Sequence, residues 1–267
     1  MYRRLCWHSN KPQQQQQQQL RQSEQLFGNR MSTMTTSTNP TKKTAPPSDD
    51  IKIVAAAAKD ERGILDFLRV HYYREEPLTI GSEPKQQDPA DEAFHMSHIQ
   101  HGSCLMALQS RDDGCGGAAA AVVGALIAGP KEANEAELLA AEAKRLGPTK
   151  WGKALKLLEC IERNANVFER YCVERVLHVH ILAVDASVRG KALGARLMTE
   201  AMNYGRQQQF QLITADCSSV FSARLCERLG MECVNSLAYA DYKDEQGEQV
   251  FKPPEPHVAV LTYAKRL

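Results

Sequence analysis

The chain has 267 residues, with 33 basic and 32 acidic side chains and a formal net charge of +1 at pH 7. This nearly equal number of basic and acidic residues argues against a dedicated nucleic-acid-binding protein, which usually carries a clear excess of basic residues. No apolar run reaches the roughly 18 residues that a membrane-spanning helix needs, so we also expect no membrane partner.

The cysteines and the N-terminal residues indicate in which cellular compartment the protein is expected. Eight cysteines are scattered through the chain without a C-x-x-C pair. This pattern favours reduced thiols over a disulfide framework. The residues after Arg3 and Arg4 form no continuous apolar stretch of the kind that a secretory signal requires. We therefore expect a cytoplasmic protein.

Residues 1–48 are predicted to be a disordered tail. Gln13 to Gln19 is an unbroken glutamine run, and residues 32–48 are rich in Ser, Thr, Pro and Lys. Such segments cannot bury enough apolar surface to fold. The folded domain is therefore predicted to span residues 49–267.

From residue 49 on, apolar residues recur at spacings typical of strands and helices in alternation. The predicted strands are 51–57, 103–109, 118–128, 175–185, 211–217, 232–239 and 257–264. The predicted helices are 59–73, 91–100, 132–145, 151–171, 192–206 and 220–229. Loops are expected at 111–117 and 241–256, and Gly129-Pro130 is expected to end a strand. The order predicts a mixed α/β domain with an antiparallel first half and one βαβ unit. Helix 132–145 is predicted to be solvated; the alternative is that it covers the active site.

The most informative segment runs from Val179 to Glu200. An apolar strand passes through the turn Arg189-Gly190-Lys191-Ala192-Leu193-Gly194 into a helix with Leu193, Leu197 and Ala201 on one face. Unpaired N–H groups and the positive end of the helix dipole meet at such a turn, which therefore suits a phosphate. The spacing of the glycines matches neither the nucleotide P-loop nor the dinucleotide fingerprint. An ordinary βα turn with an arginine is the alternative.

Two histidines precede this turn. His178 and His180 lie two residues apart on the predicted strand, so their side chains share one face. The pair could bind zinc, but no third ligand is evident, and we predict no metal. The first interpretation is that both histidines are core residues. The second is that they lie in the substrate pocket, and we assign His180 to that pocket.

The turn resembles the acyl-CoA signature [RQ]-x-x-G-x-[GA] of the GCN5-related N-acetyltransferase (GNAT) superfamily. Ala192 stands where the first glycine is usual, and a positive φ there would cost energy. The resemblance implies a mostly antiparallel sheet that is splayed at the acyl-CoA site, with helices on both faces. It also implies that Val184 donates its N–H to the oxyanion. The implied acyl-CoA-binding residues are Leu182, Ala183, Val184, Arg189, Gly190, Lys191, Ala192, Leu193, Gly194 and Ala195.

Three further segments resemble insect arylalkylamine N-acetyltransferases. They are Y-R-E-E-P-L at 73–78, C-S-S-V-F-S-A-R at 217–224 followed by L-G-M at 229–231, and P-E-P-H at 254–257. The resemblance implies that Glu76 is the general base and that Ser218 and Ser222 assist proton transfer or substrate placement. It implies further that His257 lies near the amine pocket. Cys226 occupies the place of the wider superfamily's acid tyrosine, which the insect enzymes also lack, so the general acid stays unassigned.

The implied function is transfer of an acetyl or longer acyl group from acyl-CoA, as co-substrate, to a small primary amine such as dopamine, serotonin, tyramine or octopamine. A carboxylate can remove the ammonium proton before direct attack on the thioester, and Glu76 is held extended because it precedes a proline. The alternatives are a polyamine, amino acid or protein lysine as acceptor, or a catalytically silent acyl-CoA-binding scaffold. An acidic groove would favour the polyamine and an open groove the lysine. A monomer is favoured.

Overall fold

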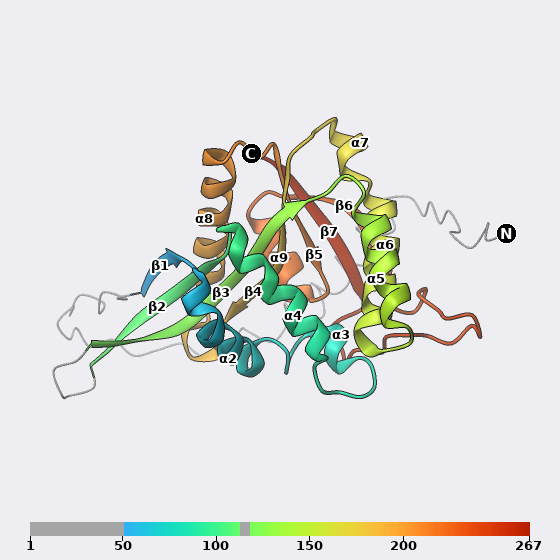
Figure 1. Ribbon diagram of the computed structural model, residues 1–267, viewed down its shortest axis with the longest axis horizontal. Coiled ribbons are helices and arrows are strands. Elements are labelled where there is room, and N and C mark those ends of the chain that lie inside the picture. Colours follow the sequence, from blue (N-terminus) through green and yellow to red (C-terminus); the bar gives the residue numbers. More distant parts are fainter. Residues whose placement is uncertain (1–50, 113–117) are drawn as a thin grey trace, which may run out of the picture. The chain divides into compact units, whose positions relative to one another are not determined.

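A seven-stranded sheet runs through the residues that the computed structural model describes, 51–112 and 118–267 (Figure 1). Its strand order is β1-β2-β3-β4-β5-β7-β6, and every neighbouring pair is antiparallel except the parallel pair β4–β5. The strands are β1 (Ile51–Ala55), β2 (Leu105–Asp112), β3 (Ala118–Lys131), β4 (Val176–Val184), β5 (Leu212–Cys217), β6 (Glu232–Ala238) and β7 (Ala259–Arg266). The predicted mixed, mostly antiparallel fold is confirmed. The predicted tail 1–48 and residues 113–117 of the predicted loop lie outside the described residues.

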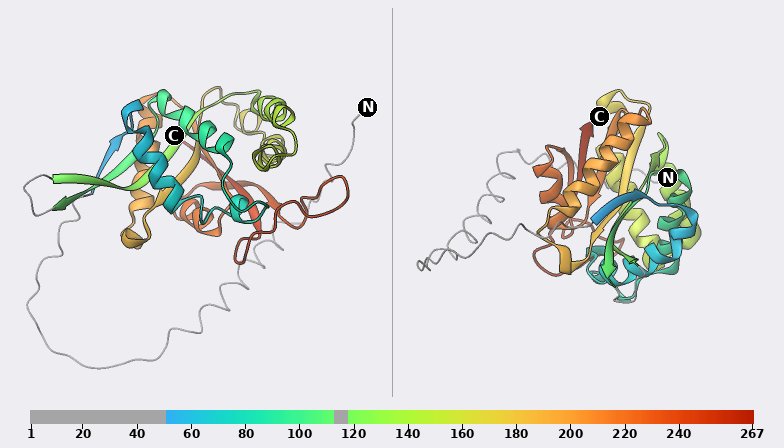
Figure 2. Two further views of the ribbon diagram at one scale, coloured as in Figure 1. Left: turned by 60° about the horizontal axis from the view of Figure 1, so that its bottom comes forward. Right: turned by 90° about the vertical axis from the view of Figure 1, so that its left-hand side faces the viewer.

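Helices cover both faces of the sheet, as predicted (Figure 2). One face carries α8 (Leu193–Gln207) and α9 (Val220–Arg228), and the other carries α2 (Glu61–His71) and α4 (Pro89–Ser97). A hairpin of α5 (Glu135–Leu146) and α6 (Lys150–Ala165) packs near β6. No helix in the described ranges is long and apolar enough to cross a membrane.

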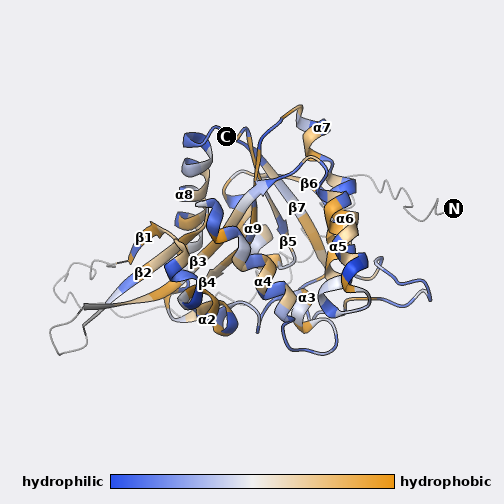
Figure 3. Cartoon of the chain, in the orientation of Figure 1, coloured by the Kyte–Doolittle hydropathy of each residue, from blue (hydrophilic) through white to orange (hydrophobic). Residues whose placement is uncertain are grey.

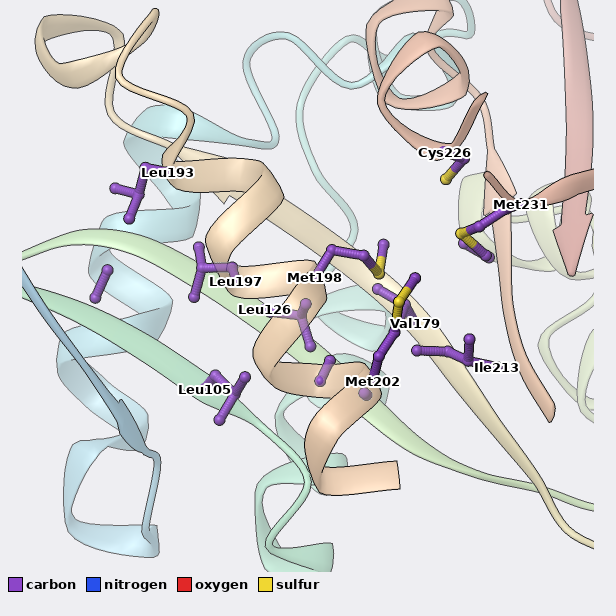
Figure 4. Packing of buried hydrophobic residues seen from close by; sticks show 14 of the residues in the cluster. Leu105, Leu126, Val179, Leu193, Leu197, Met198, Met202, Ile213, Cys226 and Met231 are labelled. Atoms are coloured by element: carbon purple, nitrogen blue, oxygen red, sulfur yellow. The ribbon is translucent and has the colours of Figure 1, made fainter. Parts of the chain in front are cut away.

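Helix α8 provides much of the core on its face of the sheet. Leu193, Leu197, Met198 and Met202 are each at most 5% exposed, and Figure 4 shows these side chains meeting residues of the sheet. The exposed positions of α8, among them Arg196, Thr199 and Glu200, are polar, so hydropathy alternates along its turns (Figure 3). Each such side chain contributes roughly 1.5–3 kcal/mol of transfer free energy, which anchors the turn that precedes the helix.

A β-bulge at His180 opens the sheet. Ile127 faces Ile181 and Ala128 faces Val179, so His180 is an extra residue in β4. Such an insertion bends the strand and changes which face the following side chains occupy. The parallel pairing with β5 ends at Val179, and β4 then runs on without a partner on that side in the described register. The splay predicted from the family resemblance is therefore present.

The sequence prediction for the end of β3 is wrong. The strand does not stop at Gly129-Pro130 but continues to Lys131, paired with the start of β4. Proline is excluded from strand interiors because it cannot donate a ladder hydrogen bond. The pairing of β3 with β2 ends at Leu126, however, so the missing N–H of Pro130 can face the open side. The extension carries Lys131 into the interior, where it is 7% exposed.

Two helix predictions are also corrected. The single helix predicted at 151–171 is broken at Asn166, whose φ of 41° lies in the left-handed region that ends helices. The structure therefore has α6 and the short α7 (Val167–Tyr171). The four-residue helix α3 (Pro77–Ile80) was missed, because it is too short to show a helical periodicity. The other boundaries differ by a few residues, as is usual at frayed ends.

Candidate active site

A pocket lies where β4 and β5 separate, beside the α5–α6 hairpin. β5 contributes Asp216 to its wall, Ser218 follows the last residue of β5, and β4 contributes His178 and His180. Further walls come from the segment that carries Glu76 and from both helices of the hairpin. Three of the residues assigned from the sequence, Glu76, His180 and Ser218, thus line one pocket.

Glu76 is held by its own backbone and by the start of α3. Its extended backbone (φ −72°, ψ 122°) makes it the N-cap of that helix, and its Oε2 accepts a hydrogen bond from the Thr79 N–H at 2.5 Å. The residue is only 7% exposed. Burial raises the pKa of Glu76, the nearby Asp91 acts in the same direction, and hydrogen bonds from backbone N–H groups oppose the shift. A carboxylate with a raised pKa in a fixed orientation can accept a proton near neutral pH.

The two histidines share the pocket wall, as their spacing predicts. Their ring centroids are 4.6 Å apart, His178 Nδ1 lies 2.9 Å from Thr214 Oγ1, and His178 Nε2 lies 3.6 Å from Asp216 Oδ2. Burial lowers the pKa of both histidines well below the usual value, and the positive charge of Lys131 adds to the effect. Both imidazoles are therefore neutral near pH 7.

The remaining assigned residues lie around the first turn of α9. Ser222 Oγ donates to the Ser219 carbonyl at 2.8 Å, and His257 Nδ1 accepts from the Val220 N–H at 3.4 Å. The His257 ring also packs against Phe221, with 5.7 Å between centroids. Neither Ser222 nor His257 is among the residues that line the pocket. Their roles in catalysis and amine binding stay predictions.

Cys226 belongs to the core. It is 1% exposed, and its Sγ lies 3.7 Å from the Cys217 Sγ. The contact with Cys226, and then burial, raise the pKa of the Cys217 thiol well above its usual value. The position at which the wider superfamily has its tyrosine is therefore occupied here by a buried cysteine of α9 in contact with Cys217, the last residue of β5.

The turn before α8 has the backbone of an anion-binding site. Gly190 (φ 83°) and Ala192 (φ 59°) are both left-handed, and α8 begins at Leu193 without a side-chain cap. The first N–H groups of α8 therefore lack partners within the helix and lie at its positive end. The Arg189 guanidinium donates to Glu75 Oε2 at 2.7 Å and to the Val184 carbonyl at 3.3 Å. This arrangement fits the diphosphate of a coenzyme A thioester.

This turn packs against the end of β4 that has no β5 partner. Leu182, Ala183 and Val184 form the part of β4 that lies beyond its pairing with β5. A Cβ added at Gly194 would lie 3.4 Å from Leu225, 3.8 Å from Val184 and 3.9 Å from Leu182, so the glycine lies against these side chains. Lys191 is exposed and Ala195 half-buried on the same turn. The predicted acyl-CoA residues are thus contiguous in space.

Sequence reasoning missed a cluster of charged residues in the pocket. Lys131, Glu135, Glu162 and Asp216 come from β3, α5, α6 and β5. The ammonium of Lys131 forms an ion pair with Glu162 Oε2. The predicted solvated helix 132–145 in fact lines the pocket through Glu135 and Leu139, which is the alternative that the sequence left open. No local pattern could have revealed this convergence.

Aromatic side chains also line the pocket. The ring centroids of Phe94 and Trp151 are 5.4 Å apart, and Phe94 also lies 5.6 Å from His180. Tyr72 lines the same cavity. Within residues 51–112 and 118–267, no group of three or more His, Cys, Asp or Glu side chains is arranged to hold a metal ion.

Comparisons with known proteins agree with this geometry. Residues 150–231 match the model of the acetyltransferase (GNAT) family. The chain is 40% identical to an agmatine N-acetyltransferase, solved as a serine-to-alanine variant in its apo form (TM-score 0.76; 82% of this chain and 100% of that one). It is also 40% identical to a Drosophila melanogaster polyamine N-acetyltransferase that forms N-acetylagmatine (TM-score 0.75; 82% and 100%). A mosquito arylalkylamine N-acetyltransferase-like 5b protein is 38% identical (TM-score 0.74; 81% and 100%).

The chain therefore belongs to the GNAT acetyltransferase family. The resemblance to insect arylalkylamine N-acetyltransferases, inferred from the sequence, is confirmed. Members of this family use acetyl-CoA.

Proposed function

We propose that the protein transfers the acetyl group of acetyl-CoA to a small primary amine. The observation that carries the proposal is a buried, fixed carboxylate, Glu76, in a pocket that opens at the splay of β4 and β5. The turn that we assign to the diphosphate follows the same strand and has left-handed backbone at Gly190 and Ala192. Family membership supports the same reaction class.

The proposed reaction is a direct transfer. Glu76 takes a proton from the substrate ammonium, and the neutral nitrogen attacks the thioester carbonyl carbon. The oxyanion that forms accepts hydrogen bonds from backbone N–H groups at the open edge of β4, with Val184 the expected donor. The C–S bond then breaks, the amide remains, and the thiolate leaves and takes up a proton. Residues 182–184 and 189–195 hold the coenzyme A portion, while Ser218 and Ser222 position the reacting groups.

We propose further that the amine carries a second positive charge. The carboxyl groups lining the pocket outnumber the lysine ammonium groups by six to two: Glu76, Asp88, Asp91, Glu135, Glu162 and Asp216 against Lys131 and Lys150. A cavity with this excess attracts cations and disfavours anions. Polyamines and guanidino amines fit, and two relatives at 40% identity are named for such substrates.

An arylalkylamine is the second candidate, because a different observation favours it. Phe94, Trp151 and Tyr72 line the pocket, and stacked or edge-on packing stabilises an aromatic ring between such side chains. The mosquito relative is named as an arylalkylamine N-acetyltransferase-like protein. This candidate predicts turnover of tyramine and dopamine as well.

A thiol-release assay with acetyl-CoA tests the proposal. The panel is agmatine, spermidine, tyramine, dopamine and a lysine peptide, and the control is the Glu76→Gln variant. Release of coenzyme A with agmatine or spermidine supports the dicationic substrate, whereas release with tyramine alone supports the second candidate. If acetyl-CoA raises the melting temperature but no amine releases coenzyme A, the enzymatic proposal is wrong and the silent scaffold is favoured.

Cytoplasmic location, a monomeric state and tolerance of longer acyl donors remain predictions. Cell fractionation, size-exclusion chromatography with light scattering, and the same assay with longer acyl-CoA thioesters would test them.

A further inference from the structure

The α5–α6 hairpin extends along the pocket, and its turn lies beside Glu76. Lys150, the first residue of α6, donates from Nζ to the carbonyls of Thr79 and Pro84, both at 2.5 Å. Thr79 belongs to α3, the helix that Glu76 caps. In Figure 1, α3 lies near the hairpin turn. This end of the pocket therefore holds the proposed base.

The opposite end of the hairpin brings other carboxylates to the pocket. Glu135 is the first residue of α5, and Glu162 lies near the end of α6. An ion pair of 2.9 Å between Arg163 and Glu137 joins the helices at this end. Because α5 has 12 residues, it is about 18 Å long at the usual rise per residue. The pocket thus has two acidic ends, separated by most of the length of a helix.

The cluster at the far end carries too little positive charge for its carboxylates. Lys131 forms an ion pair with Glu162, and Asp216 Oδ1 accepts from Thr262 Oγ1 at 2.7 Å. Glu135 Oε2 accepts a 3.2 Å hydrogen bond from the Glu132 N–H. The neighbouring His178 is neutral, because burial lowers its pKa. One ammonium therefore faces three carboxylates.

An excess of negative charge in a partly buried cluster is costly unless a cation joins it. Burial raises the pKa of both Glu135 and Glu162, and the negative charge of Asp216 contributes in each case. A bound cation would stabilise the ionised carboxylates. The cluster lines the same cavity as Glu76, so a single extended molecule can reach both ends.

We propose that Glu135, together with Glu162 and Asp216, binds the distal positive charge of the amine substrate while Glu76 receives the proton of the reacting nitrogen. The inference rests on the proposed function and names its specificity-determining residues. Lys131 keeps the carboxylates partly neutralised when the pocket holds no substrate. A substrate without a second charge gains nothing from this end, and its ring would lie on the aromatic side chains that line the cavity.

The test compares two neighbouring substitutions on α5. Glu135→Gln removes the carboxylate that faces the pocket and keeps the side-chain shape. Glu137→Gln is the matched control, because Glu137 is exposed and pairs with Arg163 rather than lining the pocket. For each variant, kcat/KM is measured with the multiply charged amines agmatine and spermidine and compared with kcat/KM for the monocation tyramine. Melting temperatures check that the variants are folded.

We expect Glu135→Gln to lower kcat/KM for agmatine or spermidine at least about tenfold, mainly through KM, because a partly buried charge pair is lost. For tyramine, the value should stay within about twofold. Glu137→Gln should change neither. Equal losses for agmatine and tyramine, or no loss for either dication, would overturn the inference.

A binding measurement separates this inference from the proposed function. If the wild-type protein acetylates no amine, the proposed function fails, and calorimetric titration with agmatine or spermidine in the presence of coenzyme A still decides the inference. Binding to the wild type that weakens at least about tenfold in Glu135→Gln, but not in Glu137→Gln, supports the distal site. Absence of binding, or equal binding by both variants, refutes it.

Discussion

Ala192→Gly is expected to stabilise the protein at the turn that we assign to acetyl-CoA. Ala192 has a φ of 59°, and an L-residue in this region costs roughly 1–2 kcal/mol. Glycine removes that strain but loses roughly 0.5–1 kcal/mol through the greater freedom of the unfolded chain. The net gain is therefore about 0.5–1 kcal/mol. For a domain of this size, it corresponds to a rise in Tm of about 1–4 °C.

Gly190→Ala is the matched control in the same turn. Gly190 has a φ of 83°, and an added Cβ would meet nothing within 4 Å, so the substitution isolates the backbone term. We expect it to lower stability by about 1 kcal/mol, the opposite sign to Ala192→Gly. Urea denaturation of the ligand-free protein, followed by circular dichroism, measures both. A loss of stability in Ala192→Gly, or a gain in Gly190→Ala, would refute the argument from backbone strain.

Four further substitutions probe the base, two glycines and the core. Glu76→Gln should lower kcat/KM about 10²–10⁴-fold and abolish its fall at acidic pH; because burial raises the Glu76 pKa, that fall should lie above the usual glutamate range. Because the pKa of Glu76 is higher in the folded than in the unfolded protein, Glu76 stabilises the fold below its unfolded pKa, and this stabilisation is lost as pH rises through the folded pKa. If Glu76→Gln leaves the pH dependence of stability unchanged, the raised pKa is contradicted. Gly81→Ala should destabilise by about 1–3 kcal/mol, because its Cβ would lie 2.5 Å from the Pro77 carbonyl and 2.7 Å from the Pro253 nitrogen. Gly63→Ala, in an open stretch of α2, should instead stabilise by about 0.5–1 kcal/mol, and thermal melts of the two should diverge. Leu197→Ala, at a fully buried position of α8, should cost about 2–5 kcal/mol in urea denaturation, and a loss under 1 kcal/mol would mean that the core collapses around it.

Local chemistry in the sequence was enough to predict the strand-turn-helix unit around Arg189 and the extended backbone of Glu76. Apolar spacing placed Leu193 and Leu197 on one face of α8, and a following proline excluded a helical conformation at Glu76. These features depend on residues within one or two turns of each other, so a linear pattern contains them. The same holds for the order of the elements, from which the mixed sheet follows.

Tertiary structure alone decided the wall of the pocket. The bulge at His180 exists because β3 and β4 pair on both sides of one extra residue, and Pro130 is tolerated because β3 lacks a second neighbour there. Lys131 and Glu162 form their ion pair across 31 positions of the chain, and Glu135 joins them only through the packing of the hairpin against the sheet. In its own segment of the sequence, each of these charged residues has the pattern of an ordinary surface residue. Their position in the pocket depends on long-range contacts, which the periodicity of a single chain segment cannot predict.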